Sequence, residues 1–158
     1  MTYLASRQIG IDMGHRVPDH GSKCRNLHGH RYTIEAILQS SELHASGEQK
    51  GMVLDFGFLK QLMVEKIEGV FDHALCLAWD DPLLDMFGVN LTEPPKHFRD
   101  YLVRGCRVIL IDRTPTAENL AALWWELLEA PVRAMSKDLC FLQSVKVWET
   151  PNCWASYP

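Results

Sequence analysis

The sequence has no apolar run approaching the roughly 18 residues that a membrane-spanning helix needs, so we expect no membrane partner. Its first residues, Met1–Arg7, also lack the basic-then-apolar order of a signal peptide. Cysteine is sparse: there are five, an odd number without Cys-x-x-Cys spacing, which argues against a disulfide scaffold. Together these absences favour a reducing, cytoplasmic setting.

An excess of basic residues is missing as well. Lys and Arg total 16 against 20 Asp and Glu, which gives a net charge of −4, so we expect no nucleic-acid partner. What the chain does have is a hydrophobic content of 47% in 158 residues, enough for the core of one domain. We therefore interpret residues 1–158 as a single domain.

Alternation of apolar and polar side chains predicts the strands of this domain. In the first strand, Ile9, Ile11 and Met13 share one face with His15, which stands at the strand end. The predicted strands are residues 3–15, 28–38, 141–149 and 154–157, with a further β-rich run at 107–111. The last of the four follows a turn at Pro151-Asn152, which is typical of a short edge strand.

Two amphipathic helices are predicted between these strands. The first, residues 55–69, starts at Asp55, whose carboxylate suits an N-cap. The second opens at Thr114-Pro115-Thr116, where Pro115 suits the first turn and either threonine can cap; Pro131 marks its end or a kink. The order strand-strand-helix-helix-strand-strand predicts an α+β fold, an antiparallel four-stranded sheet with two helices packed on one face. Residues 79–106 are expected to form a long excursion from it.

His28-Gly29-His30 is the centre of the predicted site. Side chains alternate along a strand, so both imidazoles point to one side and can bind one metal, while glycine leaves the opposite face uncrowded. His15 offers a third imidazole, and three histidines without an obvious fourth ligand are typical of a catalytic zinc with an open position. Iron, copper and nickel also accept nitrogen ligands, and a single histidine on an apolar face is more often a core residue than a ligand.

Cys24 lies four residues before His28, between Lys23 and Arg25. Positive potential at this position favours the thiolate, which could remove a proton or attack a carbonyl. Two alternatives stay open from the residues alone. Cys24 could be a fourth zinc ligand that closes a structural site, or a small buried hydrophobe like most free cysteines.

Three carboxylates and one more histidine complete the candidate residues. Asp72 directly precedes His73 and can fix the orientation of its imidazole. Glu149 ends a strand; if buried, it would suit a ligand with two adjacent N–H donors, such as a pterin or guanine ring, and otherwise it reaches solvent. Glu118 lies in the first turn of the second helix, where the helix dipole favours a negative charge.

Six separated motifs span nearly the whole chain. They are Gly14-His15-Arg16, Cys24-x3-His28-Gly29-His30, Gly51-Met52-Val53-Leu54-Asp55-Phe56, Asp72-His73, Pro115-Thr116-Ala117-Glu118-Asn119 and Glu149-Thr150-Pro151. In type and order they resemble the 6-pyruvoyltetrahydropterin synthase and 6-carboxytetrahydropterin synthase family. The resemblance implies the tunnelling fold (T-fold), whose units assemble through their sheets, typically into a homohexamer of two stacked trimers with active sites at subunit interfaces.

The resemblance also implies a role for each matching residue. The zinc ligands would be His15, His28 and His30; Cys24 would abstract a proton; Asp72 and His73 would complete its relay across an interface; Glu149 would anchor the pterin ring, in a pocket also lined by Thr116 and Glu118. The implied substrate is 7,8-dihydroneopterin triphosphate, whose anionic tail would suit the cluster of Arg16, Lys23 and Arg25.

The gap of three residues between Cys24 and His28 is similar to that of the bacterial 6-carboxytetrahydropterin synthases of the queuosine pathway. The resemblance therefore favours a lyase that forms 6-carboxytetrahydropterin and releases acetaldehyde and triphosphate. The alternatives are a pyruvoyl-forming elimination, a non-catalytic pterin-binding relative and a structural-zinc module. The sequence departs from the family pattern at Arg31, at Cys76-Leu77 and in the greater length of residues 79–106.

Overall fold

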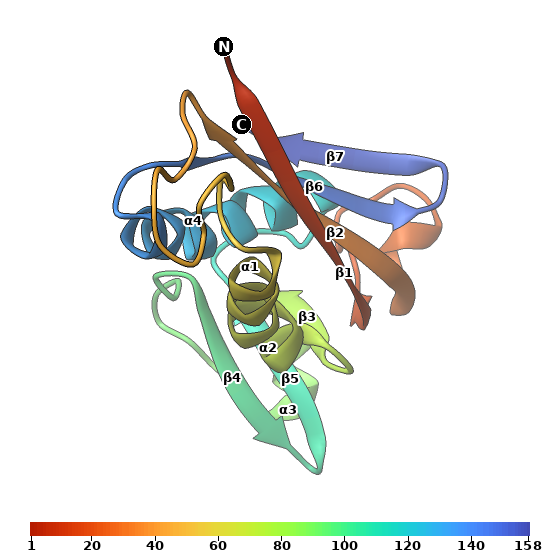
Figure 1. The fold of residues 1–158 in the computed structure, drawn as a ribbon. Helices are drawn as coiled ribbons and strands as arrows, with labels where there is room; N and C mark the ends of the chain where they lie inside the picture. The colour runs from red at the N-terminus through yellow and green to blue at the C-terminus, as the bar shows by residue number, and fades with distance from the viewer.

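The computed structural model describes residues 1–158, and its longest feature is an antiparallel ribbon of two strands. β1 (Tyr3–His15) pairs with β2 (His28–Ser40) over their full lengths, from Tyr3 opposite Ser40 to His15 opposite His28. The predicted alternation is confirmed, because every second side chain from Ile9 to His15 is buried and those between are less so. The histidine-bearing ends of both strands therefore meet at one end of the ribbon (Figure 1).

The sheet is wider than the sequence predicted. It has seven strands in the order β4-β5-β3-β1-β2-β6-β7. The four predicted strands are β1, β2, β6 and β7, which form the antiparallel half of the sheet. The prediction of a purely antiparallel four-stranded sheet was wrong, because β3 pairs in parallel with both β1 and β5. The remaining bounds are β3 (Leu75–Ala78), β4 (Phe98–Val103), β5 (Cys106–Ile111), β6 (Phe141–Thr150) and β7 (Cys153–Tyr157).

β3 and β4 were not predicted, for different physical reasons. β3 has only four residues and is almost wholly buried, so it shows no alternation. β4 is an edge strand whose side chains are all at least partly exposed. It is held by a tight hairpin to β5, in which Arg104 and Gly105 both adopt positive φ, the backbone of a two-residue turn that suits the twist of the strands.

The first predicted helix is present with an interruption. It consists of α1 (Phe56–Met63), a π-helical turn (Val64–Glu68) and α2 (Gly69–Phe71). Asp55 caps it as predicted, since its carboxylate accepts the backbone N–H groups of Gly57 and Phe58. The helix ends directly before Asp72, and this end places the Asp72-His73 pair beside Asp12 of β1.

The second predicted helix is α4 (Ala117–Ser136). Thr116 is its N-cap and accepts the N–H of Asn119, so Pro115 precedes the cap and does not lie in the first turn. Pro131 lies inside the helix, which continues to Ser136 and ends at Lys137 in the left-handed conformation. None of the helices is both long and apolar enough to cross a membrane.

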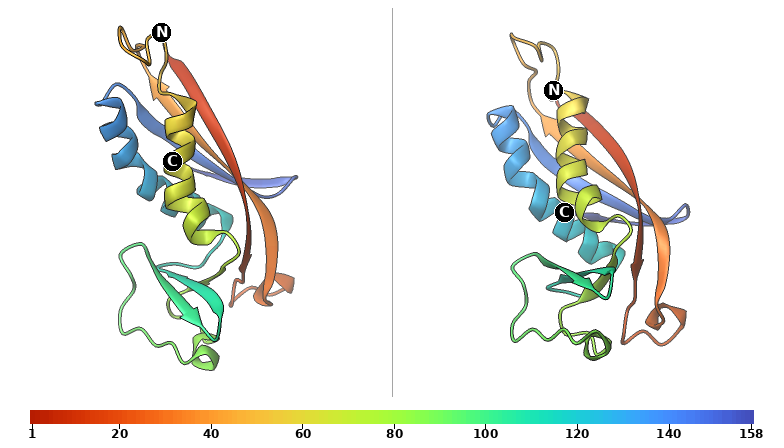
Figure 2. Two further views of the ribbon diagram at one scale, coloured as in Figure 1. Left: turned by 60° about the horizontal axis from the view of Figure 1, so that its bottom comes forward. Right: turned by 90° about the horizontal axis from the view of Figure 1, so that it is seen from below.

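Both helices cover the same face of the β1–β2 ribbon, as predicted (Figure 2). The core between them is aromatic as well as aliphatic: the ring of Trp124 on α4 meets Phe71 and Tyr32 edge to face, with centroids 5.6 and 6.4 Å apart. All three of these side chains are fully buried. The histidine-bearing ends of β1 and β2 lie at the margin of this core.

Residues 79–106 leave the body and return to it beside β3. The segment contains α3 (Leu84–Phe87) and β4, and its Leu84 packs in a second, small apolar cluster with Leu77 of β3 and Val108 and Leu110 of β5. Figure 2 shows the β4–β5 hairpin and α3 beyond the ends of the two long helices. The segment begins close to the end of β1, where β1 and β3 pair.

Candidate metal centre and active site

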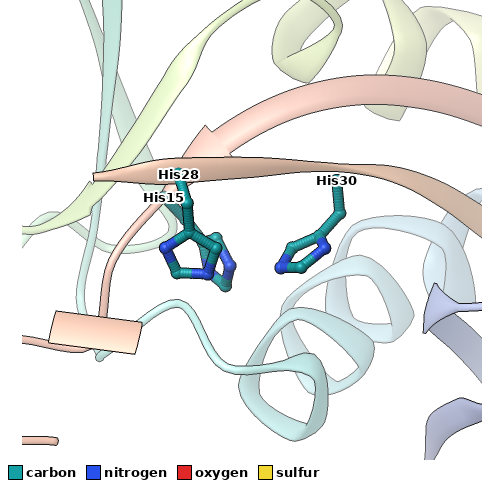
Figure 3. Close-up of side chains that lie close together, drawn as sticks. All are labelled: His15, His28 and His30. Atoms are coloured by element: carbon teal, nitrogen blue, oxygen red, sulfur yellow. The ribbon is translucent and has the colours of Figure 1, made fainter. Parts of the chain in front are cut away.

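Three imidazoles gather where β1 ends and β2 begins. His15 and His28 are cross-strand partners, and His30 follows two residues later on the same face of β2. Their ring centroids are 4.5 to 5.2 Å apart, and one ring nitrogen from each lies within 4.8 Å of the others. Figure 3 shows the three rings projecting to the same side of the strands, toward the segment that leads into α4. This arrangement is a candidate metal site.

Hydrogen bonds fix which ring nitrogen is available in two of the histidines. His15 Nδ1 donates to the carbonyl oxygen of Pro115 and His28 Nδ1 to that of Asn26, both at 2.7 Å. Because a carbonyl oxygen only accepts, Nδ1 carries the proton and Nε2 presents a lone pair. His15 Nε2 is buried and has no hydrogen-bond partner, which is unusual for a polar atom and fits a metal ligand.

The protonation state also suits metal binding. Burial lowers the pKa of His15, and the hydrogen bond to Pro115 and the nearby Glu149 oppose this shift only in part. Burial likewise lowers the pKa of His30. Both rings therefore favour the neutral form, which is the form that coordinates metals.

Glu149 lies closer to the histidines than the sequence indicated. Its Oε1 is 3.2 Å from His15 Nε2 and 3.6 Å from His30 Nε2, although neither contact is directed as a hydrogen bond. Its side chain is 28% exposed, so it is neither fully buried nor released into solvent. The carboxylate thus stands at the edge of the candidate metal site with much of its accepting capacity free.

Tyr32 is a residue of this site that the sequence analysis did not single out. Its buried hydroxyl donates to Glu149 Oε1 at 3.4 Å, and its ring stands edge-on to His15 and His30. Burial and the neighbouring carboxylate raise its pKa, so it stays a hydrogen-bond donor. The signal was present in the sequence, since Tyr32 continues the His28, His30 alternation along β2.

A cavity of about 350 Å³ opens beside His15 and brings together several of the predicted residues. Cys24, Thr116, Glu118 and Glu149 all line it, although they come from three separate parts of the chain. Cys24 is half-buried and is not among the side chains whose ligand atoms cluster within 4.8 Å. The other residues that line the cavity are Val17, His20, Ala117, Cys153 and Trp154.

Asp72 and His73 are held together but lie apart from Cys24. His73 Nδ1 is 2.8 Å from Asp72 Oδ2, and the other Asp72 oxygen accepts the N–H of Asp12 on β1. His73 has positive φ, a strained backbone that is stabilised by donation of its N–H to the Asp12 carbonyl at 2.7 Å. His73 lines a separate, larger groove of about 900 Å³, and Cys24 does not line that groove. A single chain therefore does not unite the three predicted relay residues.

The surroundings of Asp72 keep it ionised. Burial alone would raise its pKa, but the hydrogen bonds from the Asp12 backbone and from His73 and the charge of Arg31 together lower it. Arg31, which departs from the family pattern, forms an ion pair with Asp12 at 2.7 Å. Asp12, Asp72 and His73 form a second group of potential metal ligands, but these contacts already occupy it.

One predicted substrate contact is not available. Arg16 donates through Nε and Nη2 to the buried carboxylate of Asp81, so its charge is already paired. Lys23 and Arg25 remain exposed on the loop around Cys24. The basic cluster expected to receive an anionic tail is thereby reduced to these two residues.

The fold and the site together define a class of protein, an α+β protein with three clustered histidines that form a candidate metal site and a cysteine in the adjoining cavity. A model of the 6-pyruvoyl tetrahydropterin synthase family matches residues 5–158, nearly the whole chain. The chain belongs to this family, as the sequence motifs predicted.

Individual relatives agree with this assignment. The chain is 35% identical over 150 residues to the 6-carboxy-5,6,7,8-tetrahydropterin synthase of Rickettsia conorii, a match that covers 94% of this chain and 95% of the relative. Its structure is similar to that of an uncharacterised protein from Wolinella succinogenes, with a TM-score of 0.82, 24% identity and coverage of 99% and 98%. It is also similar to the 6-pyruvoyl tetrahydropterin synthase of Caenorhabditis elegans, with a TM-score of 0.61, 20% identity and coverage of 99% and 95%. The two structures support the T-fold.

Proposed function

We propose that the protein is a 6-carboxy-5,6,7,8-tetrahydropterin synthase. It converts 7,8-dihydroneopterin triphosphate and water to 6-carboxytetrahydropterin, with release of acetaldehyde and triphosphate, and serves queuosine and 7-deazapurine biosynthesis in the cytoplasm. The name of the Rickettsia conorii relative supports this choice within the family. The observation that carries it is the cavity that Cys24 and Glu149 line together with His15, one of the three clustered histidines.

The metal is zinc in this proposal, held by His15, His28 and His30. The buried, unpartnered Nε2 of His15 and the proton on Nδ1 of both His15 and His28 support the fit. Zinc bound there would supply Lewis-acid polarisation of an oxygen on the substrate side chain.

Cys24 acts as the thiolate that removes a proton from the substrate side chain. It lines the same cavity as His15, it is half-buried, and it stays outside the ligand cluster, so its sulfur is free for chemistry. Lys23 and Arg25 on either side provide positive potential that favours the thiolate.

Glu149 anchors the pterin ring by accepting two adjacent N–H groups. Its free accepting capacity supports this role, and donation from Tyr32 keeps one oxygen aimed into the site. Thr116 and Glu118 complete the same wall of the cavity. Because the Thr116 hydroxyl also caps α4, that wall is tied to the rigid start of a helix.

Asp72 and His73 serve as the general acid–base pair of a neighbouring subunit's site. Asp72 orients His73 and stays ionised, so the imidazole can exchange protons with side-chain oxygens. Their position in a groove separate from Cys24 supports a site completed across an interface. A homohexamer built as a dimer of trimers would provide such interfaces.

Product analysis tests the proposal. Zinc-loaded protein with 7,8-dihydroneopterin triphosphate should release acetaldehyde and leave 6-carboxytetrahydropterin, both detected by mass spectrometry. A product that keeps all side-chain carbons would instead identify the pyruvoyl-forming reaction. Tight pterin binding without any product would indicate a non-catalytic relative.

The role of Cys24 needs its own variant. Cys24→Ala should abolish turnover and leave the zinc content unchanged. Loss of zinc in this variant would assign Cys24 as a ligand of a structural site. Cys153→Ala is the matched control, because Cys153 is a second thiol on the same cavity; it should retain turnover.

A further inference from the structure

An ion pair between Arg16 and Asp81 joins the start of the 79–106 segment to the end of β1. The side chain of Asp81 is completely buried, and Arg16 approaches it with two nitrogens in a fork, Nε lying 2.9 Å from Oδ2. Asp81 also accepts the N–H of Leu83 at 2.8 Å. A buried carboxylate is stable only when it is paired and hydrogen-bonded in this way, so the contact is strongly determined.

The third nitrogen of the same guanidinium reaches in a different direction. Arg16 Nη1 donates to the carbonyl oxygen of Arg25 at 3.5 Å, and Arg25 directly follows Cys24. The next residue along, Val17, donates its N–H to the Cys24 carbonyl at 2.8 Å. Arg16, which is paired with Asp81, and Val17 therefore contact the two carbonyl groups that directly follow the Cys24 side chain, those of Arg25 and Cys24.

Apart from the hydrogen bond from His28 Nδ1 to the Asn26 carbonyl, the Cys24 loop has few other contacts to hold it. It contains one short 3-10 turn, Lys23–Arg25, none of whose side chains is buried, and the Ser22 side chain does not cap it. Loop backbone with few buried contacts opens easily unless something ties it down. The two hydrogen bonds from Arg16 and Val17 tie the residues around Cys24 to the end of the strand that bears His15.

From this geometry we infer that Arg16 and Asp81 are positioning residues that hold Cys24 in place relative to the histidines. The long 79–106 segment then has a function, since its buried Asp81 orients the guanidinium that braces the Cys24 loop. The inference rests on the proposed role of Cys24. It also reassigns Arg16 from substrate binding to loop positioning and leaves Lys23 and Arg25 to meet an anionic substrate.

Asp81→Asn tests this inference, because the amide keeps the size of the side chain and an acceptor for Leu83 but loses the charge. Turnover should fall about 100-fold in kcat, as small displacements of a reacting group do, with the zinc content unchanged. Amide hydrogen exchange at Val17, Arg25 and Asn26 should accelerate about tenfold. Arg16→Lys should accelerate exchange at the same loop amides, because one ammonium cannot reach both Asp81 and the Arg25 carbonyl. Exchange at Leu84, whose N–H donates to the Asp81 carbonyl at 2.9 Å, should stay unchanged, because the ammonium still pairs with Asp81.

Asp100→Asn is the matched control. Asp100 is paired in the same fork geometry with Arg107, on the same segment but without contact to the Cys24 loop. In this variant, kcat and the exchange rates of the loop amides should stay at wild-type values. The inference is overturned if Asp81→Asn accelerates exchange only within residues 79–89, or if its kcat stays within about twofold of wild type.

The activity measurement and the hydrogen-exchange measurement together separate this inference from the proposed function. If the wild-type protein releases no acetaldehyde, the proposed function fails, while hydrogen exchange still decides whether Asp81 braces the Cys24 loop. If acetaldehyde is released and the loop amides of Asp81→Asn are unchanged, the proposed function stands and the positioning role fails.

Discussion

His15 donates a hydrogen bond from Nδ1 to the carbonyl oxygen of Pro115, 100 residues further along the chain, at 2.7 Å. Pro115 immediately precedes Thr116, the N-cap of α4, so the orientation of the ring depends on where that helix begins. Because this bond uses Nδ1, the other ring nitrogen, Nε2, faces the cavity. A backbone contact thus selects the ligating nitrogen of the most buried histidine in the group.

The first prediction concerns metal binding. His15→Ala should weaken zinc affinity by more than about 100-fold, since the loss of a ligand costs more than the loss of an outer-shell partner. Competition against a chromophoric chelator measures this. His20→Ala is the control, because its imidazole lines the same cavity but lies outside the ligand group; equal losses in both variants would refute the assignment of the ligands.

The second prediction concerns the pH dependence of stability in the metal-free protein. The pKa values of His15 and His30 are lowered by burial, so between their folded values and about 6.5 the unfolded chain binds protons that the folded protein does not. Stability should therefore be fully present above pH 6.5 and decline as the pH falls through that window. Each of the two histidines lowers the free energy of unfolding by at most about 1.4 kcal/mol per pH unit in this window.

Urea unfolding of chelator-treated protein between pH 8 and pH 5 gives the measurement. A His15→Gln/His30→Gln double variant keeps polar side chains but removes both titrations, so its stability should fall less steeply over this range. Identical slopes for the variant and the wild type would contradict the shifted pKa values. Added zinc should steepen the loss at low pH, because protons compete with the metal for the rings.

Much of the site could be predicted from the sequence because its residues lie in regular elements. The alternation along β1 and β2 placed His15, His28 and His30 on one face, and pairing of the strand ends brought them together. Asp55 and Thr116 were recognisable as caps because N-caps depend on local backbone geometry.

The rest depends on contacts between distant segments. The parallel pairing of β3 with β1 covers only two residue pairs, and no periodicity signals it. The Arg16–Asp81 pair joins residues 65 positions apart, and nothing in the local sequence distinguishes a buried Asp81 from its neighbour Asp80. Such pairs are set by tertiary packing, which a single sequence does not display.

The third prediction addresses the separation of Cys24 from Asp72 and His73. Cys24→Ala and Asp72→Asn should each be inactive alone, but mixed oligomers should recover activity, because some interfaces then combine an intact Cys24 with an intact Asp72-His73 pair. After unfolding and joint refolding at equal ratios, about a quarter of the sites should be intact. Turnover of the mixture is the readout; no recovery would mean that one chain supplies the whole relay.

The fourth prediction concerns Gly29, between the two β2 histidines. A Cβ at this position would lie 3.1 Å from the backbone carbonyl oxygen of Met13 on β1, and backbone cannot easily move aside. Gly29→Ala should therefore separate the strand ends, destabilise the protein by about 1–3 kcal/mol and weaken zinc binding.

Gly21→Ala provides the comparison for this substitution, because a Cβ at Gly21 meets nothing within 4 Å. Chemical unfolding and zinc titration of both variants separate the steric effect at the strand pair from a general effect of replacing glycine. If Gly29→Ala binds zinc as tightly as Gly21→Ala does, close approach of β1 and β2 is not needed to set the spacing of the imidazoles. Weaker zinc binding in Gly29→Ala alone would mean that the glycine in His-Gly-His is needed for the close approach of the β1 backbone. The register of His15 against His28 would then set the geometry of the metal site.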